Sequence, residues 1–144
     1  MEKKEDVARN VAESFCTGIS INITLIVGLA GAGIDNSIIF LSGVATAFAL
    51  AASSFIKGLL AKNVYFLAFL GTFFGGFTPA LTFAFIPTPR IALLISSLFA
   101  LFLVFVISSS AVEKKTYKDG FKAVILLAMQ IAIVYYLLKF FSLL

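Results

Sequence analysis

Residues 91–112 read IALLISSLFALFLVFVISSSAV, a run without a single charged side chain. A membrane-spanning helix needs about 20 mostly apolar residues, so this run is long enough to cross a bilayer. Residues 98–107 within it do not alternate between apolar and polar side chains, as the strands of a membrane barrel would. Because only helices and closed barrels pair every backbone polar group within lipid, the run predicts a transmembrane helix.

Four similar runs flank this one, and short polar or proline-containing breaks separate them. The five predicted spans are residues 16–34, 37–56, 64–86, 91–112 and 121–141. The chain is 61% hydrophobic and 12% charged, whereas soluble domains are about 45–50% apolar and 25% charged. We therefore expect an all-α integral membrane protein, with residues 1–144 as one transmembrane domain and a cytoplasmic helical extension of the first helix at about residues 5–15.

The first span is not expected to be a cleaved signal peptide, because further membrane segments follow it directly. The positive charges predict its orientation. When the Lys and Arg residues are assigned to alternating sides of the bilayer, all except Arg90 and Lys139 fall on the side of the N-terminus. This is the positive-inside pattern, so we expect the N-terminus in the cytoplasm and the C-terminus outside, in the cell membrane of a prokaryote.

The net charge of +4 therefore serves topology and contact with the lipid bilayer, and no nucleic-acid partner is expected. The chain contains no His and one Cys, which excludes an internal disulfide and a histidine-based metal site. The acidic residues all lie at or beyond the ends of the predicted spans. Without an acid–base or nucleophile pair, we expect no enzyme and no tightly bound cofactor.

Small and polar residues form one face of the first predicted helix, at about 100° per residue. They are Glu13, Thr17, Ser20, Thr24, Gly28 and Gly31. One interpretation is close contact between helices, where small residues and hydroxyls are favoured. The other is a polar transport path, with Glu13 and Cys16 as candidate metal ligands at its cytoplasmic end. Glu13 also stands four residues after Arg9, a spacing that allows a surface ion pair.

The second and third spans carry related features. Ser53 and Ser54 add hydroxyls near the cytoplasmic end of the second span. The third contains Gly71 and Gly75 in GxxxG spacing, followed by Pro79, so we expect it to pack tightly and to bend. Asn22 lies on the side of the first helix opposite the small polar face, and we expect its amide to bond another helix.

The order of these features resembles the vacuolar iron transporter (VIT) family. Residues 17–31 (TGISINITLIVGLAG) are similar to its first-helix signature, including the glycines. Residues 51–61 (AASSFIKGLLA) and 75–83 (GGFTPALTF) resemble its second-helix and third-helix elements, and residues 118–121 fit the polar turn before the last helix. The resemblance implies five helices and a homodimer whose ion path runs between the first helices of the two copies.

The chain also departs from that family. The family's Asp, Met and Glu path ligands fall here on Thr17, Ser54 and Gly58, and residues 57–63 leave no room for its cytosolic metal-binding domain. One hypothesis is a divergent transporter of divalent metal, with iron or manganese as substrate, and a path lined by Glu13, Thr17, Ser20, Thr24, Ser53 and Ser54. The alternative keeps the fold but moves another small solute or serves a structural or partner role.

Overall fold

The computed structural model describes residues 2–60, 65–110 and 117–141, with side chains from residue 6 in the first helix and from residue 66 in the third. These residues form five α-helices: α1 (Glu2–Gly31), α2 (Asn36–Leu60), α3 (Tyr65–Phe85), α4 (Pro89–Ser110) and α5 (Tyr117–Phe141). Each is long and apolar enough to cross a membrane. The predicted class of all-α membrane protein is confirmed, while residue 64 and residues 111–112 of the predicted spans lie outside the described residues.

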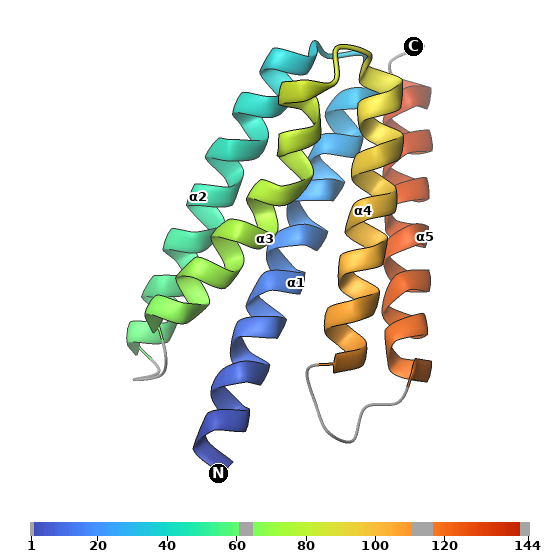
Figure 1. Ribbon diagram of the computed structural model, residues 1–144. Helices are drawn as coiled ribbons and strands as arrows, with labels where there is room; N and C mark the ends of the chain where they lie inside the picture. Colours follow the sequence, from blue (N-terminus) through green and yellow to red (C-terminus); the bar gives the residue numbers. More distant parts are fainter. Residues whose placement is uncertain (1, 61–64, 111–116, 142–144) are drawn as a thin grey trace.

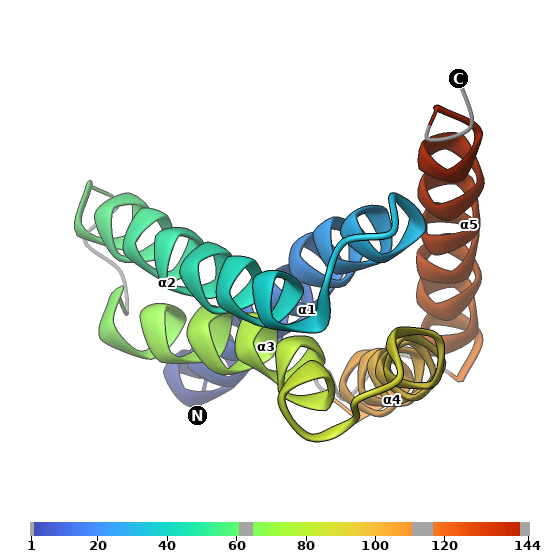
Figure 2. The same cartoon turned by 90° about the horizontal axis from the view of Figure 1, so that it is seen from above.

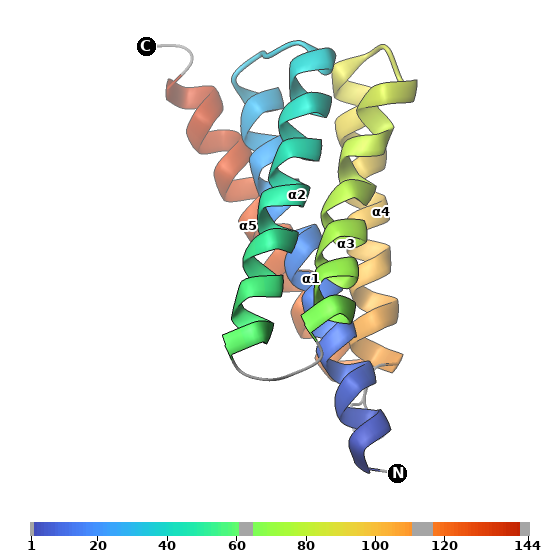
Figure 3. The ribbon, with the colours of Figure 1, turned by 90° about the vertical axis from the view of Figure 1, so that its left-hand side faces the viewer.

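Helix α1 is the centre of the bundle, because it contacts each of the other four helices. Figure 2 shows it between the α2–α3 pair on one side and the α4–α5 pair on the other. α1 starts at one end of the bundle and α5 finishes at the other (Figure 1). The first turns of α1 project beyond the remaining helices (Figure 3). Residues 5–15, for which the sequence predicts a helical extension, all belong to α1, and Val11, Ser14 and Phe15 among them already face α3.

Glycines bring the backbones of α1 and α3 into direct contact. A Cβ atom on Gly18 would overlap the carbonyl oxygen of Thr72, and one on Gly75 would overlap that of Phe15. A Cβ on Gly71 would lie 2.9 Å from the carbonyl oxygen of Val11. In lipid, such close backbone approach replaces the hydrophobic effect as a source of helix association.

Asn22 ties three helices together beside this contact. Its side chain is fully buried, and Nδ2 donates hydrogen bonds to the carbonyl oxygen of Gly43 in α2, at 2.8 Å, and to that of Gly76 in α3. The expectation that Asn22 bonds another helix is confirmed. A buried amide without such partners would cost several kcal/mol, about 2–7 by transfer measurements, so this contact restricts the rotation of α1.

Pro79 of α3 is fully buried. Its carbonyl oxygen accepts hydrogen bonds from Ser96 Oγ of α4 at 2.9 Å and from Thr82 Oγ1 at 3.0 Å. Proline lacks a backbone donor and disturbs the turn before it. The Ser96 bond, which comes from the neighbouring helix, joins α3 to α4 at Pro79.

The turn from α1 to α2 has a defined geometry. Gly33 adopts a left-handed conformation with φ of 77°. The Ile34 amide donates to the Leu29 carbonyl and the Gly33 amide to the Ala30 carbonyl, both at 3.1 Å. This pair of bonds is a Schellman motif, which satisfies the last carbonyls of a helix. It directs the chain back toward the bundle, so that α2 runs antiparallel to α1.

We predict that Gly75→Ala destabilises the protein by about 1–3 kcal/mol, the usual cost of overpacking a close contact. The added methyl group meets the backbone of α1, which cannot move aside cheaply. Gly28→Ala is the matched control, since its methyl group meets only the ends of side chains, those of Leu138 and Val134. Unfolding in detergent micelles measures both variants, and equal stability of the two would contradict the proposed backbone contact.

Candidate functional site

A groove of about 330 Å³ lies between α1, α4 and α5. Its polar lining comes from three helices and consists of Cys16, Thr17, Ser20, Ser108 and Gln130. The other lining residues are apolar. The five polar residues distinguish the groove from an ordinary gap between membrane helices. Gln130 stands near the middle of α5, so the groove reaches the middle of that helix.

Gln130 forms a hydrogen-bonded link between α5 and α1. Ser20 Oγ donates to Gln130 Oε1 at 3.3 Å, and Gln130 Nε2 donates to Thr24 Oγ1 at 2.7 Å. Thr24 Oγ1 in turn donates to the Ser20 carbonyl oxygen at 2.6 Å. Polar side chains within a membrane commonly bond across helices in this way. Two of the residues predicted for the path are therefore held against α5.

Gln130 lies outside the residues that the sequence interpretation selected. The signal for it is present, because a lone amide in the middle of the apolar run from residue 121 to residue 141 needs a polar partner. The helical period indicates the face on which Gln130 lies. It does not indicate which neighbouring helix that face meets, and this information comes from the bundle.

Thr17 supplies an oxygen acceptor to the groove. Its Oγ1 donates to the Glu13 carbonyl oxygen at 2.8 Å, which uses the single hydroxyl proton and leaves the oxygen lone pairs for another group. Gln130 Oε1 also has a second acceptor position beyond the bond from Ser20. Oxygen acceptors without nearby positive charge suit a cation or another hydrogen-bond donor.

Glu13 does not line this groove and lies in a surface ion-pair network. Its carboxylate is 3.9 Å from Arg9 Nε, and Arg9 Nη2 is 3.6 Å from Asp6 Oδ1. The Glu13 side chain is 63% exposed, and exposed ion pairs contribute at most about 1 kcal/mol. Cys16, the other candidate metal ligand, lines the groove, whereas Glu13 does not. Within the described residues, no three His, Cys, Asp or Glu side chains gather in a way that could hold a metal ion.

The two hydroxyls predicted on α2 lie elsewhere. The Ser54 and Thr72 hydroxyls are hydrogen-bonded at 2.9 Å between α2 and α3, and Ser53 is exposed on α2. Neither residue lines the groove. Within one copy of the chain, the six predicted path residues are therefore distributed over separate faces of the bundle.

The glycines of the small polar face contact α5. Gly28 faces Leu138 and Val134, and Gly31 faces Tyr135. The half of this face that is nearer the end of α1 is thus a helix–helix contact surface. The half around Thr17 and Ser20 borders the groove.

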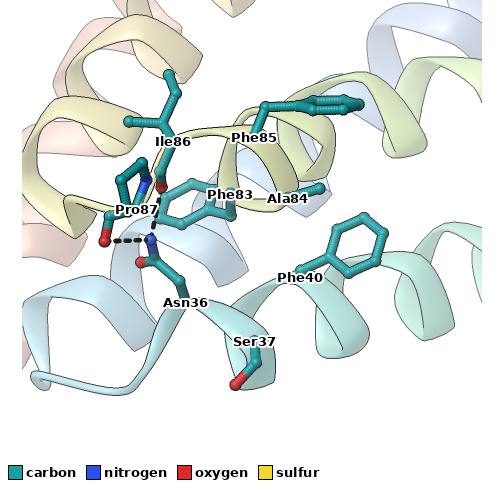
Figure 4. A pocket seen from close by; sticks show the side chains of 8 residues that line it. All are labelled: Asn36, Ser37, Phe40, Phe83, Ala84, Phe85, Ile86 and Pro87. Atoms are coloured by element: carbon teal, nitrogen blue, oxygen red, sulfur yellow. Dashed lines mark hydrogen bonds between the residues drawn. The ribbon is translucent and has the colours of Figure 1, made fainter.

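A second pocket, of about 470 Å³, lies where α2 begins and α3 ends (Figure 4). Asn36 Nδ2 donates to the carbonyl oxygens of Ile86 at 2.7 Å and Pro87 at 3.1 Å. Phe40, Phe83 and Phe85 supply much of the remaining wall. Asn36 fastens the loop after α3 to the start of α2, which is a structural role.

The arrangement defines an α-helical integral membrane protein with a partly polar groove between α1, α4 and α5. Large apolar side chains are exposed on the outside of the bundle, such as Phe102 at 60% and Leu126 at 68%. A helical membrane protein presents such a surface to lipid. Neither the known protein-family models nor the curated proteins give a match to this chain. The resemblance to the vacuolar iron transporter family therefore rests on its sequence motifs.

We predict that Gln130→Leu destabilises the protein by about 1 kcal/mol, because interhelical hydrogen bonds in membranes contribute about 0.6 kcal/mol each. The change removes both bonds to α1 and keeps the apolar bulk of the side chain. Met129→Leu is the control, since Met129 is 55% exposed at the same depth. Thermal unfolding in detergent measures the difference, and identical midpoints would show that the Gln130 bonds contribute nothing to stability.

Proposed function

We propose that this chain is a divergent transporter of the vacuolar iron transporter type, which moves a divalent metal ion, Fe²⁺ or Mn²⁺, across a membrane. The observation that carries the proposal is the groove whose lining includes two hydroxyls, Thr17 and Ser20, that donate their protons to protein oxygens and can still accept. Thr17 is the clearest case, because its proton is directed to the Glu13 carbonyl. Such oxygens can replace part of the water shell of a cation.

The ligand chemistry favours weak binding. Hydroxyl and amide oxygens are hard ligands that suit Mn²⁺, and the Cys16 sulfur in the same lining adds a softer ligand. A transported ion has to leave its site, so a site without carboxylates is compatible with passage. Glu13, exposed one turn before Thr17, is proposed to gather cations at the entrance of the groove.

The proposed transport unit is a homodimer with the α1 helices of the two copies facing each other. Ile21 of α1 is 43% exposed and Thr17 is exposed as well, although both belong to the central helix. A second copy would cover these residues and shield the Thr17 oxygen from lipid. In this proposed dimer, Ser53 on the exposed face of α2 would also approach the interface. Within a single copy, Ser53 does not line the groove.

The proposed orientation has the N-terminus in the cytoplasm of a prokaryotic cell and the bundle in the cell membrane. The groove would then open toward the cytoplasm, since its lining residues lie in the second half of α4 and the first half of α5. Metal ions would enter from the cytoplasm and pass toward the outside.

A second candidate function keeps the fold without metal transport. The described residues contain no cluster of metal-binding side chains, and Ser54 is occupied by its bond to Thr72. A groove lined by neutral oxygens and amides also fits a small polar solute. This candidate includes a structural or partner role for the same membrane domain.

We predict that the purified protein, reconstituted in liposomes with an internal metal indicator, admits Mn²⁺ or Fe²⁺ faster than protein-free liposomes. Thr17→Val keeps the side-chain shape and removes the oxygen, so it should lower the initial rate about tenfold, the loss expected from 1.4 kcal/mol of binding. Met129→Leu should leave the rate unchanged. Glu13→Gln tests the entrance, and an unchanged rate would remove Glu13 from the path.

If neither Mn²⁺ nor Fe²⁺ enters the liposomes, the result favours the second candidate. An ionophore added to the same liposomes should still let the metal in, which shows that the indicator responds. Equal rates for wild type and Thr17→Val would exclude the groove as the path, even if metal entered.

We also predict that Ile21→Cys, in a Cys16→Ser background, forms a disulfide-linked dimer in membranes treated with a mild oxidant. Phe102→Cys on α4 is the control, because Phe102 is 60% exposed and does not line the groove. Gel electrophoresis without reductant measures the linkage. Equal linkage of the two variants, or none in either, would contradict an interface between α1 helices.

A further inference from the structure

A separate cavity lies at the end of the bundle opposite the N-terminus. Its volume is about 880 Å³, and its walls come from the α1–α2 turn, the start of α4 and the last turns of α5. It shares no lining residue with the groove beside Gln130. The residues that give it chemical character are Asp35, Thr88, Arg90, Tyr135 and Lys139.

Arg90 and Lys139 are the two basic residues that the positive-inside assignment leaves on this side of the membrane. They are far apart in the sequence, yet both line this one cavity. Basic residues on the outer side do not help to set the orientation of a membrane protein. Their convergence therefore calls for another explanation, and a shared anionic ligand supplies one.

One of the two basic side chains contacts the cavity wall directly. Lys139 Nζ lies 6.0 Å from the centre of the Tyr135 ring, which holds the ammonium group beside the wall through a weak cation–π contact. Asp35 is the one carboxylate in the lining. The ion pairs recorded between described residues involve neither Asp35 nor Arg90, so the guanidinium group is not neutralised by that carboxylate.

Helix α4 adds to the positive character of the cavity. It begins at Pro89, and the amides of Ile91 and Ala92 donate to the Thr88 carbonyl oxygen at 3.1 and 3.0 Å. The start of a helix carries a partial positive charge. The lining thus combines two basic side chains, this helix end and one carboxylate.

We propose that this cavity binds a phosphate group, either the headgroup phosphate of an anionic phospholipid or inorganic phosphate. Arginine presents a planar fork of donors that matches two phosphate oxygens at once, and Lys139 supplies a second point charge. The cavity lies at the ends of three helices, α1, α4 and α5, each long and apolar enough to cross a membrane. The ends of such helices reach the headgroup layer of a bilayer. A bound phosphate would join α4 and α5 to the α1–α2 turn.

The test uses the full chain, stripped of lipid in detergent, with two separate ligands. Native mass spectrometry follows adducts of phosphatidylglycerol, with diacylglycerol of the same acyl chains as the ligand without phosphate. Calorimetric titration with inorganic phosphate covers the second source. We expect phosphatidylglycerol, inorganic phosphate or both to bind, and diacylglycerol not to form specific adducts.

Three variants connect the binding to the cavity. Arg90→Gln and Lys139→Gln should each weaken binding about tenfold or more, since a hydrogen bond to a charged group contributes at least this much. Asp35→Asn should strengthen binding, because it removes the opposing carboxylate, and it introduces no change in size. Lys122→Gln is the matched control on α5 at the other end of the bundle, where Lys122 is exposed.

Binding by phosphatidylglycerol alone would identify the lipid headgroup as the ligand, and binding by inorganic phosphate alone would identify the free anion. The proposal is overturned if neither binds, or if Arg90→Gln, Lys139→Gln and Lys122→Gln bind equally. If the Gln variants fail to fold, Asp35→Asn decides, and unchanged affinity in that variant overturns the site. The metal-entry assay does not depend on this cavity, so the two proposals can fail separately.

Discussion

The rest of the structure depends on the direct backbone contact between α1 and α3 at Gly18 and Gly75. Lipid offers no hydrophobic driving force between helices, so association needs close backbone approach and polar bonds. Because there is no room for a Cβ at either glycine, α1 comes near enough for Asn22 to reach the backbones of α2 and α3. These bonds set the rotation of α1. The opposite face of the helix is thereby turned toward α5.

Because of this rotation, the two sides of α1 have different surroundings. The Asn22 side is a buried junction of three helices. The Ser20 side meets Gln130 of α5 and borders an open groove. The proposed transport path requires a polar lining that does not collapse into helix contact. Gln130 provides this, since its amide spans the space between the helices and leaves acceptor oxygens beside it.

The candidate site was only partly predictable from the residues. Thr17 and Ser20 follow from the helical period, and both line the groove. Ser54 has the same hydroxyl chemistry, but its neighbour is Thr72 in α3. Glu13 has the charge expected of a metal ligand, yet Arg9 one turn earlier lies within ion-pair distance at the surface. Residue type and helical phase describe what a face offers, and they contain no information on which helix lies opposite.

The sequence by itself determined the membrane class, the five helices and the unequal distribution of basic residues. These are properties of composition and local pattern, because each apolar run has to satisfy its own backbone within lipid. Only the tertiary structure decided the partners: Gln130 with Ser20 and Thr24, Asn22 with two glycine carbonyls, and Arg90 with Lys139 around one cavity. Such pairs join residues far apart in the chain. Their meeting depends on how the helices pack, which local pattern does not contain.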